Sequence, residues 1–289
     1  MPGINQAPEA GLRAPLILLP SSRSSTTATP LGEGLPTQEE LLVHYPAKFT
    51  WKQLKTFVNS GDLGLLKRDK RLQVRYDLWA EGIKTDYGSI VKYLKDYRLQ
   101  WGKHDNLSLI PTALGTGSGQ FPPYIGVLGT DTTELSPPYF TADTPAQYIS
   151  VIQNDWPYSV PAEVEHTLIW TNIPVYPIIP LLITARVSQD GLWGFTGLSP
   201  SSPPPSPSTL PSCLPALEEW GITLDKMVVS ARGTKEEQDM VQRAGAEIHE
   251  WVKRRWKEDE WEAAWFVNPP RLQSVPGLAH IHVFARRKT

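Results

Sequence analysis

The sequence WFVNPPRLQSVPGLAHIHVFARRKT, residues 265–289, indicates how the core of the fold is built. It holds two apolar runs rich in aromatic and β-branched residues, with prolines and a glycine between them. We therefore expect two strands, 261–267 and 279–286, joined by a loop. His280 and His282 lie two residues apart in the second strand. Because side chains alternate between the two faces of a strand, both imidazoles point to the same face.

Other segments add to this sheet and place a helix on it. Residues 164–171, VEHTLIWT, have the composition of a strand and carry His166, and residues 226–230 are a further short strand candidate. Residues 234–255 begin with a capping box and continue with apolar residues three or four apart, which predicts a long amphipathic helix. Nothing in the pattern requires parallel strands, so we expect an antiparallel sheet with a helix on one face.

The first ordered part of the chain is expected to be helical. Thr37 and Thr50 each begin the spacing of a capping box, in which a hydroxyl accepts from the open amides of a first helical turn. From residue 69 to residue 97, apolar and aromatic residues mostly recur three or four apart. This predicts two helices or one bent helix, with Gly82 and Gly88 as the weak points.

Three segments are expected to lie outside the packed core. Residues 1–36 are rich in Pro, Ser, Thr and Gly without periodicity, which predicts a disordered N-terminal segment. Residues 103–143 form a loop insert whose TALGTGSGQ stretch lacks the lysine and the following helix of a phosphate-binding loop. Residues 188–215 are a Pro/Ser-rich linker of polyproline character. The fold class is therefore α+β, with a single domain over 37–287 in which a helical N-terminal part packs with a small antiparallel sheet and the amphipathic helix.

Composition limits the classes of function. The formal charge of −2 and the pI of about 6.3 give no electrostatic reason to expect nucleic-acid binding. The apolar run at residues 16–19 is too short to span a bilayer, so we expect no membrane segment. Cys213 is the one cysteine and cannot form an intrachain disulfide, and its proline-rich surroundings argue against a structural role. A reducing, cytoplasmic location follows as the expectation.

Two turns offer side chains to a ligand. In NDWPY, residues 154–158, Asp155 could orient a histidine, and Trp156, with Tyr158 nearby, could stack on the C–H face of a sugar ring. The alternative is a rigid turn in which Asn and Asp bond their own backbone and the two rings pack. Asn268, before two prolines, presents the same choice between an amide offered to a ligand and a stiff corner.

Three stretches of the chain resemble one known family. They are RYDLWAEGIKTDYGSIVKYLKDYRLQW (75–101), NDWPYSVPAEVEHTLIWT (154–171) and WFVNPPRLQSVPGLAHIHVFAR (265–286). Together they resemble the fungal N-acetylglucosamine-induced protein family, and the likeness leaves the N-terminal segment and both inserts outside. The resemblance implies a domain of unknown function linked to the cellular response to N-acetylglucosamine and to amino-sugar metabolism. It supplies no catalytic residues.

The histidines admit a metal interpretation. His280 and His282 project from one strand, and His166 can supply a third nitrogen from another. Three imidazoles with an open position suit a catalytic zinc, or a ferrous ion when a carboxylate such as Asp155 joins them. Whether His166 faces the pair depends on the strand register, which the sequence leaves open.

A second interpretation is phosphoryl or nucleotidyl transfer. HIHVF resembles the histidine strand of histidine-triad hydrolases and hexose-1-phosphate uridylyltransferases, which implies His282 as the nucleophile and His280 as its helper. Arg286 or Arg271 would neutralise phosphate charge. Phe284 stands where the triad has its third histidine, which counts against this interpretation.

The third interpretation is structural: neutral imidazoles donate to backbone carbonyls or carboxylates and tie the sheet together. Weighing the three, the sequence predicts a cytosolic protein of N-acetylglucosamine response or amino-sugar metabolism. It would bind a small polar ligand, such as a phosphorylated or nucleotide-linked sugar, in a cleft lined by His166, His280, His282 and Trp156. The alternatives are a non-enzymatic regulatory or scaffolding protein, recruiting polyproline-binding partners through 199–211, and a histidine-dependent metalloenzyme or transferase. Whether the protein is an enzyme stays open.

Overall fold

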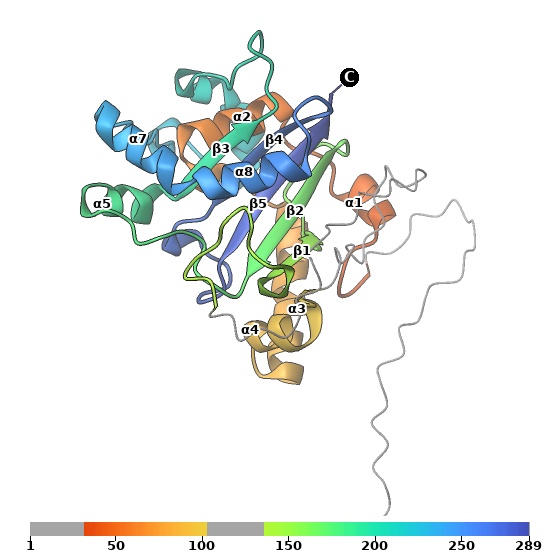
Figure 1. The fold of residues 1–289 in the computed structure, drawn as a ribbon. Coiled ribbons are helices and arrows are strands. Elements are labelled where there is room, and N and C mark those ends of the chain that lie inside the picture. Colours follow the sequence, from red (N-terminus) through yellow and green to blue (C-terminus); the bar gives the residue numbers. More distant parts are fainter. Residues whose placement is uncertain (1–31, 103–135, 289) are drawn as a thin grey trace, which may run out of the picture. The chain divides into compact units, whose positions relative to one another are not determined.

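The computed structural model describes residues 32–102 and 136–288. Within these residues the chain forms eight α-helices and a five-stranded sheet (Figure 1). The strands are β1 (Ile149–Gln153), β2 (Val164–Thr171), β3 (Leu192–Thr196), β4 (Trp261–Val267) and β5 (His280–Arg287). The helices are α1 (Gln38–His44), α2 (Trp51–Ser60), α3 (Lys70–Tyr87), α4 (Ile90–Tyr93), α5 (Leu181–Asp190), α6 (Leu214–Leu217), α7 (Lys235–Ala244) and α8 (Ala246–Arg255). Of the segment expected to be disordered, 1–36, residues 1–31 lie outside the described residues, as do residues 103–135 of the loop insert. The described ends of both segments pack, contrary to expectation: the carbonyls of Gly34 and Leu35 accept from Arg75, and Phe140 is buried in the core.

The sheet is antiparallel throughout, as predicted, and its strand order is β1-β2-β5-β4-β3. In the pairing of β2 with β5, Trp170 lies opposite His280, Leu168 opposite His282, and His166 opposite Phe284. His166 is therefore the diagonal neighbour of His282 on the same face, close enough for two ring side chains to touch.

Helices cover both faces of the sheet. One face carries Ile281 and Val283 of β5 and packs against α5 and α8, with Val187 and Val252 among the buried contacts. Figure 1 shows α7 and α8 on this side and α2 on the opposite side. On that opposite face, Phe284 and its neighbours pack against α2 and the segment around α6. His280 and His282 lie on this same face as Phe284, and both are buried.

Helix boundaries follow the local chemistry of the sequence. The three predicted capping boxes form at Thr37, Thr50 and Thr234, where each hydroxyl accepts from the third backbone amide of its helix. Helix α3 runs through Gly82 without a break and ends at Gly88, whose φ of +83° suits glycine. Of the two predicted weak points, only Gly88 ends the helix.

The predicted long amphipathic helix is two helices, α7 and α8, that meet at Gly245. A Cβ atom at residue 245 would lie 2.8 Å from Cη2 of Trp265. Since Trp265 is a buried residue of β4, the glycine allows the chain to approach the sheet closely where the two helices join.

The segment 188–215, predicted as a linker, is largely ordered and packed. Strand β3 lies within it and pairs with β4 at one edge of the sheet. Further along, Leu210 and Cys213 are buried against α2, so Cys213 does pack in the core, contrary to prediction. The prediction failed because the many prolines indicate a linker, whereas a five-residue strand and two isolated apolar side chains give only weak sequence signals.

The strand expected at 226–230 does not form. Its backbone instead bonds the end of α2 and the turn after it: the Val228 amide donates to Asp62 at 3.0 Å and the Ser230 amide to the carbonyl of Ser60 at 2.7 Å. As for membranes, the described part of the chain contains no helix with the length and apolar character needed to cross one.

Candidate ligand-binding site

A cavity of about 280 Å³ lies on the face of the sheet that carries the paired histidines. Strands β2 and β5 supply Trp170, His280 and His282, and helices α3 and α4 supply aromatic side chains opposite them. The NDWPY turn and Asn268 close the sides. Of the residues predicted to bind a ligand, the cavity brings together Asp155, Trp156, Tyr158, Asn268, His280 and His282.

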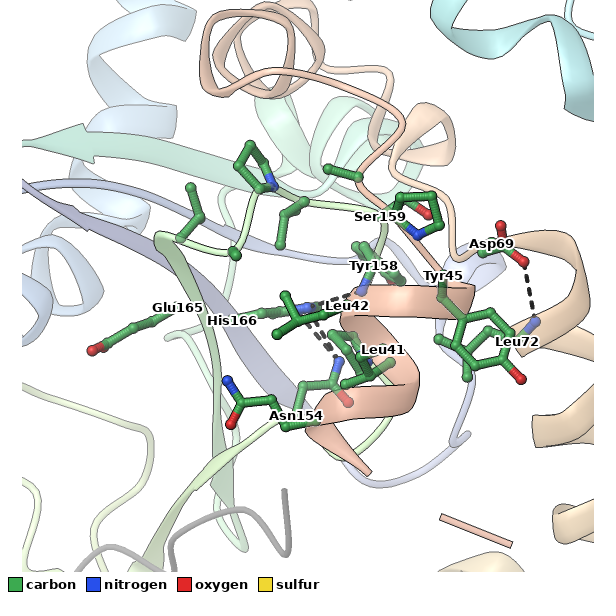
Figure 2. A pocket seen from close by; sticks show the side chains of 18 of the residues that line it. Leu41, Leu42, Tyr45, Asp69, Leu72, Asn154, Tyr158, Ser159, Glu165 and His166 are labelled. Carbon is green, nitrogen blue, oxygen red and sulfur yellow. Dashed lines mark hydrogen bonds between the residues drawn. The ribbon is translucent and has the colours of Figure 1, made fainter. Parts of the chain in front are cut away.

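His166 and His282 are joined directly, Nε2 of His166 lying 3.0 Å from Nδ1 of His282. The backbone amide of Tyr158 donates to Nδ1 of His166 at 3.3 Å, so this nitrogen carries no proton in the neutral ring. Figure 2 shows His166 with Tyr158, and Asn154 beside it. It follows that His166 holds its proton on Nε2 and donates it to His282.

The chain of bonds continues to Asn268. His282 accepts at Nδ1, so its proton lies on Nε2, 3.2 Å from the side-chain amide of Asn268. The Asn268 side chain can accept from this N–H when its oxygen, rather than its nitrogen, faces the ring. The oxygen and nitrogen of a side-chain amide have nearly the same shape, so either orientation fits the same space. The phenol of Tyr158 bonds Asn268 in turn. Both ring nitrogens of His282 are therefore occupied.

His280 differs from His282 in having a free ring nitrogen. Its Nδ1 donates to the carbonyl of Leu278 at 3.3 Å, and its ring stacks on Trp170 with centroids 4.1 Å apart. Within the described residues, Nε2 makes no hydrogen bond. Because His280 lines the cavity, this nitrogen is a hydrogen-bond acceptor available to a ligand.

All three imidazoles are held neutral. Burial lowers the pKa of His280 to about 4. Burial also holds the pKa of His166 and of His282 well below 6.5, and the nearby positive charge of Arg68 acts in the same direction. At neutral pH the three rings therefore act as dipolar donors and acceptors rather than as cations.

Arg68 brings a positive charge to this neutral cavity. Its Nε donates to the carbonyl of Trp156 at 3.0 Å, its Nη1 donates to Gln73 at 2.6 Å, and its guanidinium lies 4.6 Å from the ring centroid of Tyr76. Among the described residues no carboxylate lies within 4.0 Å of it, and its second terminal nitrogen, Nη2, has no acceptor. Burial lowers its pKa, but a guanidinium stays ionised in proteins. A half-buried cation without a counter-ion is a place for an anionic group.

Aromatic rings form the wall opposite the histidines. Trp156 packs on Tyr76 and Trp79 with centroids 5.4 and 5.2 Å apart, and Trp79 packs on Tyr93 at 5.7 Å. Within the described part of the chain, the buried indole N–H groups of Trp156 and Trp170 have no acceptor. The wall opposite the histidines therefore provides flat apolar surface, and Trp170 lies on the histidine side, stacked on His280.

The NDWPY turn is rigid, and Asp155 has a partner other than the one expected. The side-chain oxygen of Asn154 accepts from the Trp156 amide at 2.9 Å, which is the predicted local turn. The Asp155 carboxylate forms a bidentate pair with Arg98, at 2.7 and 3.0 Å. The Asp155 carboxylate therefore anchors the chain after α4.

Two arginines expected near the histidines lie elsewhere. Arg286 is four residues from His282 along β5, a separation of about 13 Å at strand spacing, and it pairs with Glu262 at 3.3 Å. Arg271 is exposed and donates to the carbonyl of Gln189. Neither lines this cavity, so the structure does not bring Arg286 together with His280 and His282.

The three histidines do not form a metal site. Among the described residues no group of three or more His, Cys, Asp or Glu side chains is placed to hold a metal ion. The reason is chemical: His166 and His282 direct ring nitrogens at each other, and Nδ1 of His280 is bonded to a carbonyl. A zinc or iron ion would need lone pairs that these bonds occupy.

A second cavity of about 270 Å³ lies behind His166, between α1 and the start of β2. Figure 2 shows Leu41, Leu42 and Tyr45 around it, with Glu165 directed away from His166. This lining is mainly apolar and contains neither of the paired histidines. Asn154 and Tyr158 line both cavities, whereas His166 lines only this second one. The candidate site is the cavity that holds His280, His282 and Arg68.

Sequence reasoning missed part of this site. Arg68, Tyr76 and Trp79 line the cavity, yet none was assigned to it. Only the aromatic spacing along 69–97 pointed toward them, and the same spacing is typical of a buried helix face. Arg68 gave no signal, because its bond to the carbonyl of Trp156 joins residues far apart in the chain.

Fold and site together define an α+β protein with a partly enclosed, aromatic and polar cavity over one face of an antiparallel sheet. The chain belongs to the family described as Protein of unknown function (DUF3605), whose model matches residues 50–178 and 226–286, more than half of the chain. It is also similar to a crystal structure of HTC1, at 19% identity and a TM-score of 0.38, over 82% of this chain and 85% of that one. No curated protein gives a significant match.

Proposed function

We propose that this protein is a cytosolic component of N-acetylglucosamine response or amino-sugar metabolism and that it binds a phosphorylated amino sugar in the cavity beside His280. The observation that carries the proposal is Arg68, a half-buried guanidinium that faces the cavity without a carboxylate partner. Guanidinium groups bind phosphate oxygens through charge-assisted hydrogen bonds, which are stronger than neutral ones. The family resemblance supplies the amino-sugar part of the proposal.

The rest of the cavity suits the sugar. Aromatic faces such as that of Trp156 pack well against the apolar C–H face of a pyranose. The free Nε2 of His280 accepts from a sugar hydroxyl. A neutral, rigid polar framework of this kind selects a ligand by its pattern of donors and acceptors.

The volume favours a monosaccharide phosphate over a nucleotide sugar. Pockets for drug-sized ligands span about 300–1,000 Å³, and this cavity, at about 280 Å³, lies at the lower limit. A uridine diphosphate sugar would extend beyond it. We therefore rank N-acetylglucosamine 6-phosphate and 1-phosphate ahead of the uridine diphosphate form.

The protonation state favours binding over catalysis. His280, not His282, is the imidazole with a free nitrogen, which reverses the roles expected for a nucleophile and its helper. With its pKa near 4, His280 is a weak base at neutral pH, whereas an efficient general base has a pKa near the working pH. The proposal is therefore a binding function, consistent with a sensor or a carrier.

A thermal-shift screen of the full chain tests the proposal. A ligand at about 100 times its Kd stabilises the native state by about 2.7 kcal/mol, which raises the melting temperature by several degrees. We expect N-acetylglucosamine 6-phosphate or 1-phosphate at millimolar concentration to raise it, and unphosphorylated N-acetylglucosamine to raise it less. No shift with any phosphorylated amino sugar contradicts the proposal and favours a scaffolding role.

An arginine variant links the shift to the cavity. Arg68→Met keeps an unbranched apolar stem and removes the charge, so it should weaken binding of the phosphorylated sugar by roughly 10- to 100-fold, the worth of a hydrogen bond to a charged group. Arg243→Met is the matched control, because Arg243 is exposed at the end of α7. Equal loss of binding in the two variants would overturn the assignment.

A further inference from the structure

A depression lined by basic side chains lies at the other end of β5, away from the histidines. Its lining includes Lys52 and Lys55 of α2, Arg286 of β5, and Ser202 and Pro203 from the segment before α6. The acidic side chain of Glu163 lines it as well. Three cations thus face one carboxylate around Ser202.

The carboxylate of Glu262 lies beneath these cations and is already occupied. It accepts from Nε1 of Trp51 at 2.7 Å, and Arg286 and Lys55 lie 3.3 and 3.7 Å from the same oxygen. Lys55 is buried, and burial lowers its pKa. Within the described residues the buried Nε of Arg286 has no acceptor. The three positive charges of Lys52, Lys55 and Arg286 therefore exceed the two negative charges of Glu163 and Glu262.

Three Ser-Pro dipeptides occur in the same segment, at Ser199, Ser202 and Ser206. The hydroxyl of Ser199 accepts from the amide of Ser201, and that of Ser206 accepts from the amide of Ser208. The hydroxyl of Ser202 makes no hydrogen bond within the described residues, and Ser202 is exposed. Of the three, Ser202 is the one that is both free and beside the cations.

We propose that Ser202 is a phosphorylation site for a proline-directed protein kinase and that the phosphoserine docks on Lys52, Lys55 and Arg286. In the transfer, the Ser202 hydroxyl oxygen forms a bond to the γ-phosphorus of ATP, the bond from that phosphorus to ADP breaks, and the hydroxyl proton passes to the kinase. A phosphoserine carries about −1.5 to −2 charge at pH 7 and three acceptor oxygens. It neutralises the excess cations and ties the proline-rich segment to α2 and β5.

The first test maps the modification. The full chain is incubated with a proline-directed kinase and ATP, and the product is analysed by peptide mass spectrometry. We expect Ser202 to be the main site, Ser202→Ala to abolish most of the incorporated phosphate, and Ser206→Ala to retain it. Incorporation at Ser199 or Ser206 with none at Ser202 overturns the proposal.

The second test measures docking. Phosphorylated protein should melt about 2–4 °C above the unmodified protein at low salt, the shift that about one strong contact produces in a chain of this size, and less at 0.5 M salt. Lys52→Ala should reduce the rise, while Lys235→Ala, an exposed lysine on α7, should leave it unchanged. A phosphorylated Ser202 that leaves the melting temperature unchanged, or a rise that Lys52→Ala does not reduce, contradicts docking.

Discussion

The two ends of strand β5 bury polar groups on the same face of the sheet in opposite ways. At one end His280 and His282 are neutral and are connected through hydrogen bonds to a carbonyl, to His166 and to Asn268. At the other end Arg286 is charged and shares the Glu262 carboxylate with Lys55. The alternating sequence places all of these side chains on one face, with Phe284 between the two ends.

The difference follows from what each side chain can do when water is removed. An imidazole loses its proton at modest cost and then needs only one donor and one acceptor. An arginine keeps its charge, so its burial costs free energy unless a counter-ion lies beside it. The neutral end is therefore free to receive an anion at Arg68, and the charged end depends on Glu262 for its stability.

Removal of Glu262 should give the largest effect. In Glu262→Leu the cations Lys55 and Arg286 lose their shared partner, and breaking a buried ion pair costs about 3–5 kcal/mol of unfolding free energy. Urea denaturation measures the loss. Glu260→Leu, at an exposed position, should change stability by less than about 0.5 kcal/mol, and equal losses in the two variants would refute the comparison.

Acid should weaken the neutral end. His280 has a pKa of about 4 when folded and about 6.5 when unfolded, so between these pH values the unfolded chain binds a proton that the folded chain does not. Stability therefore falls as the pH drops from 6.5 toward 4, by up to about 1.4 kcal/mol per pH unit for this histidine. Urea midpoints from pH 7.5 to 5 give the slope, which His280→Gln should flatten; an unchanged slope would show that His280 titrates normally.

The bond between His166 and His282 should contribute a smaller amount. His282→Phe keeps the ring but leaves the His166 N–H and the Asn268 amide without a partner, at a cost of about 1–3 kcal/mol. A double-mutant cycle with His166→Phe should give a coupling of at least about 0.5 kcal/mol. If the stability losses of the two single variants simply add, the two rings are in contact but their hydrogen bond contributes nothing to stability. His249→Phe, at a half-buried position of α8 whose ring contacts Trp265 and no other histidine, serves as the control.

The smallest effect is expected from Lys52→Ala in unmodified protein. Lys52 is exposed and forms no ion pair within the described residues, so its loss should change stability by less than about 0.5 kcal/mol. A larger loss, measured by urea denaturation, would show that Lys52 stabilises the fold together with Lys55, Arg286 and Glu262. Lys52 would then not be a free cation at this end of β5.

The elements with strong local signals were predictable from the sequence. Strands 164–171 and 261–267 match β2 and β4, because their composition and length leave no other interpretation, and the capping boxes form where Thr stands three residues before Glu or Gln. Strands β1 and β3 were missed. Each has five residues, and the sequence around β3 is dominated by prolines and glycines.

The site was predictable only in part, because its geometry depends on register and on distant contacts. The histidine spacing placed His280 and His282 on one face, but the pairing of His166 with Phe284 decides that His166 reaches His282. Arg68 reaches the cavity through a bond to Trp156, 88 residues away in sequence. A periodicity in the sequence carries no information about such a contact.

Isothermal titration of N-acetylglucosamine 6-phosphate into the full chain tests the central claim most directly, with Arg68→Met titrated in parallel. The account predicts saturable binding with one site per chain, at least about tenfold weaker in Arg68→Met and weaker still for unphosphorylated N-acetylglucosamine. Absence of binding, or affinity that is the same in the wild type and Arg68→Met, would contradict it.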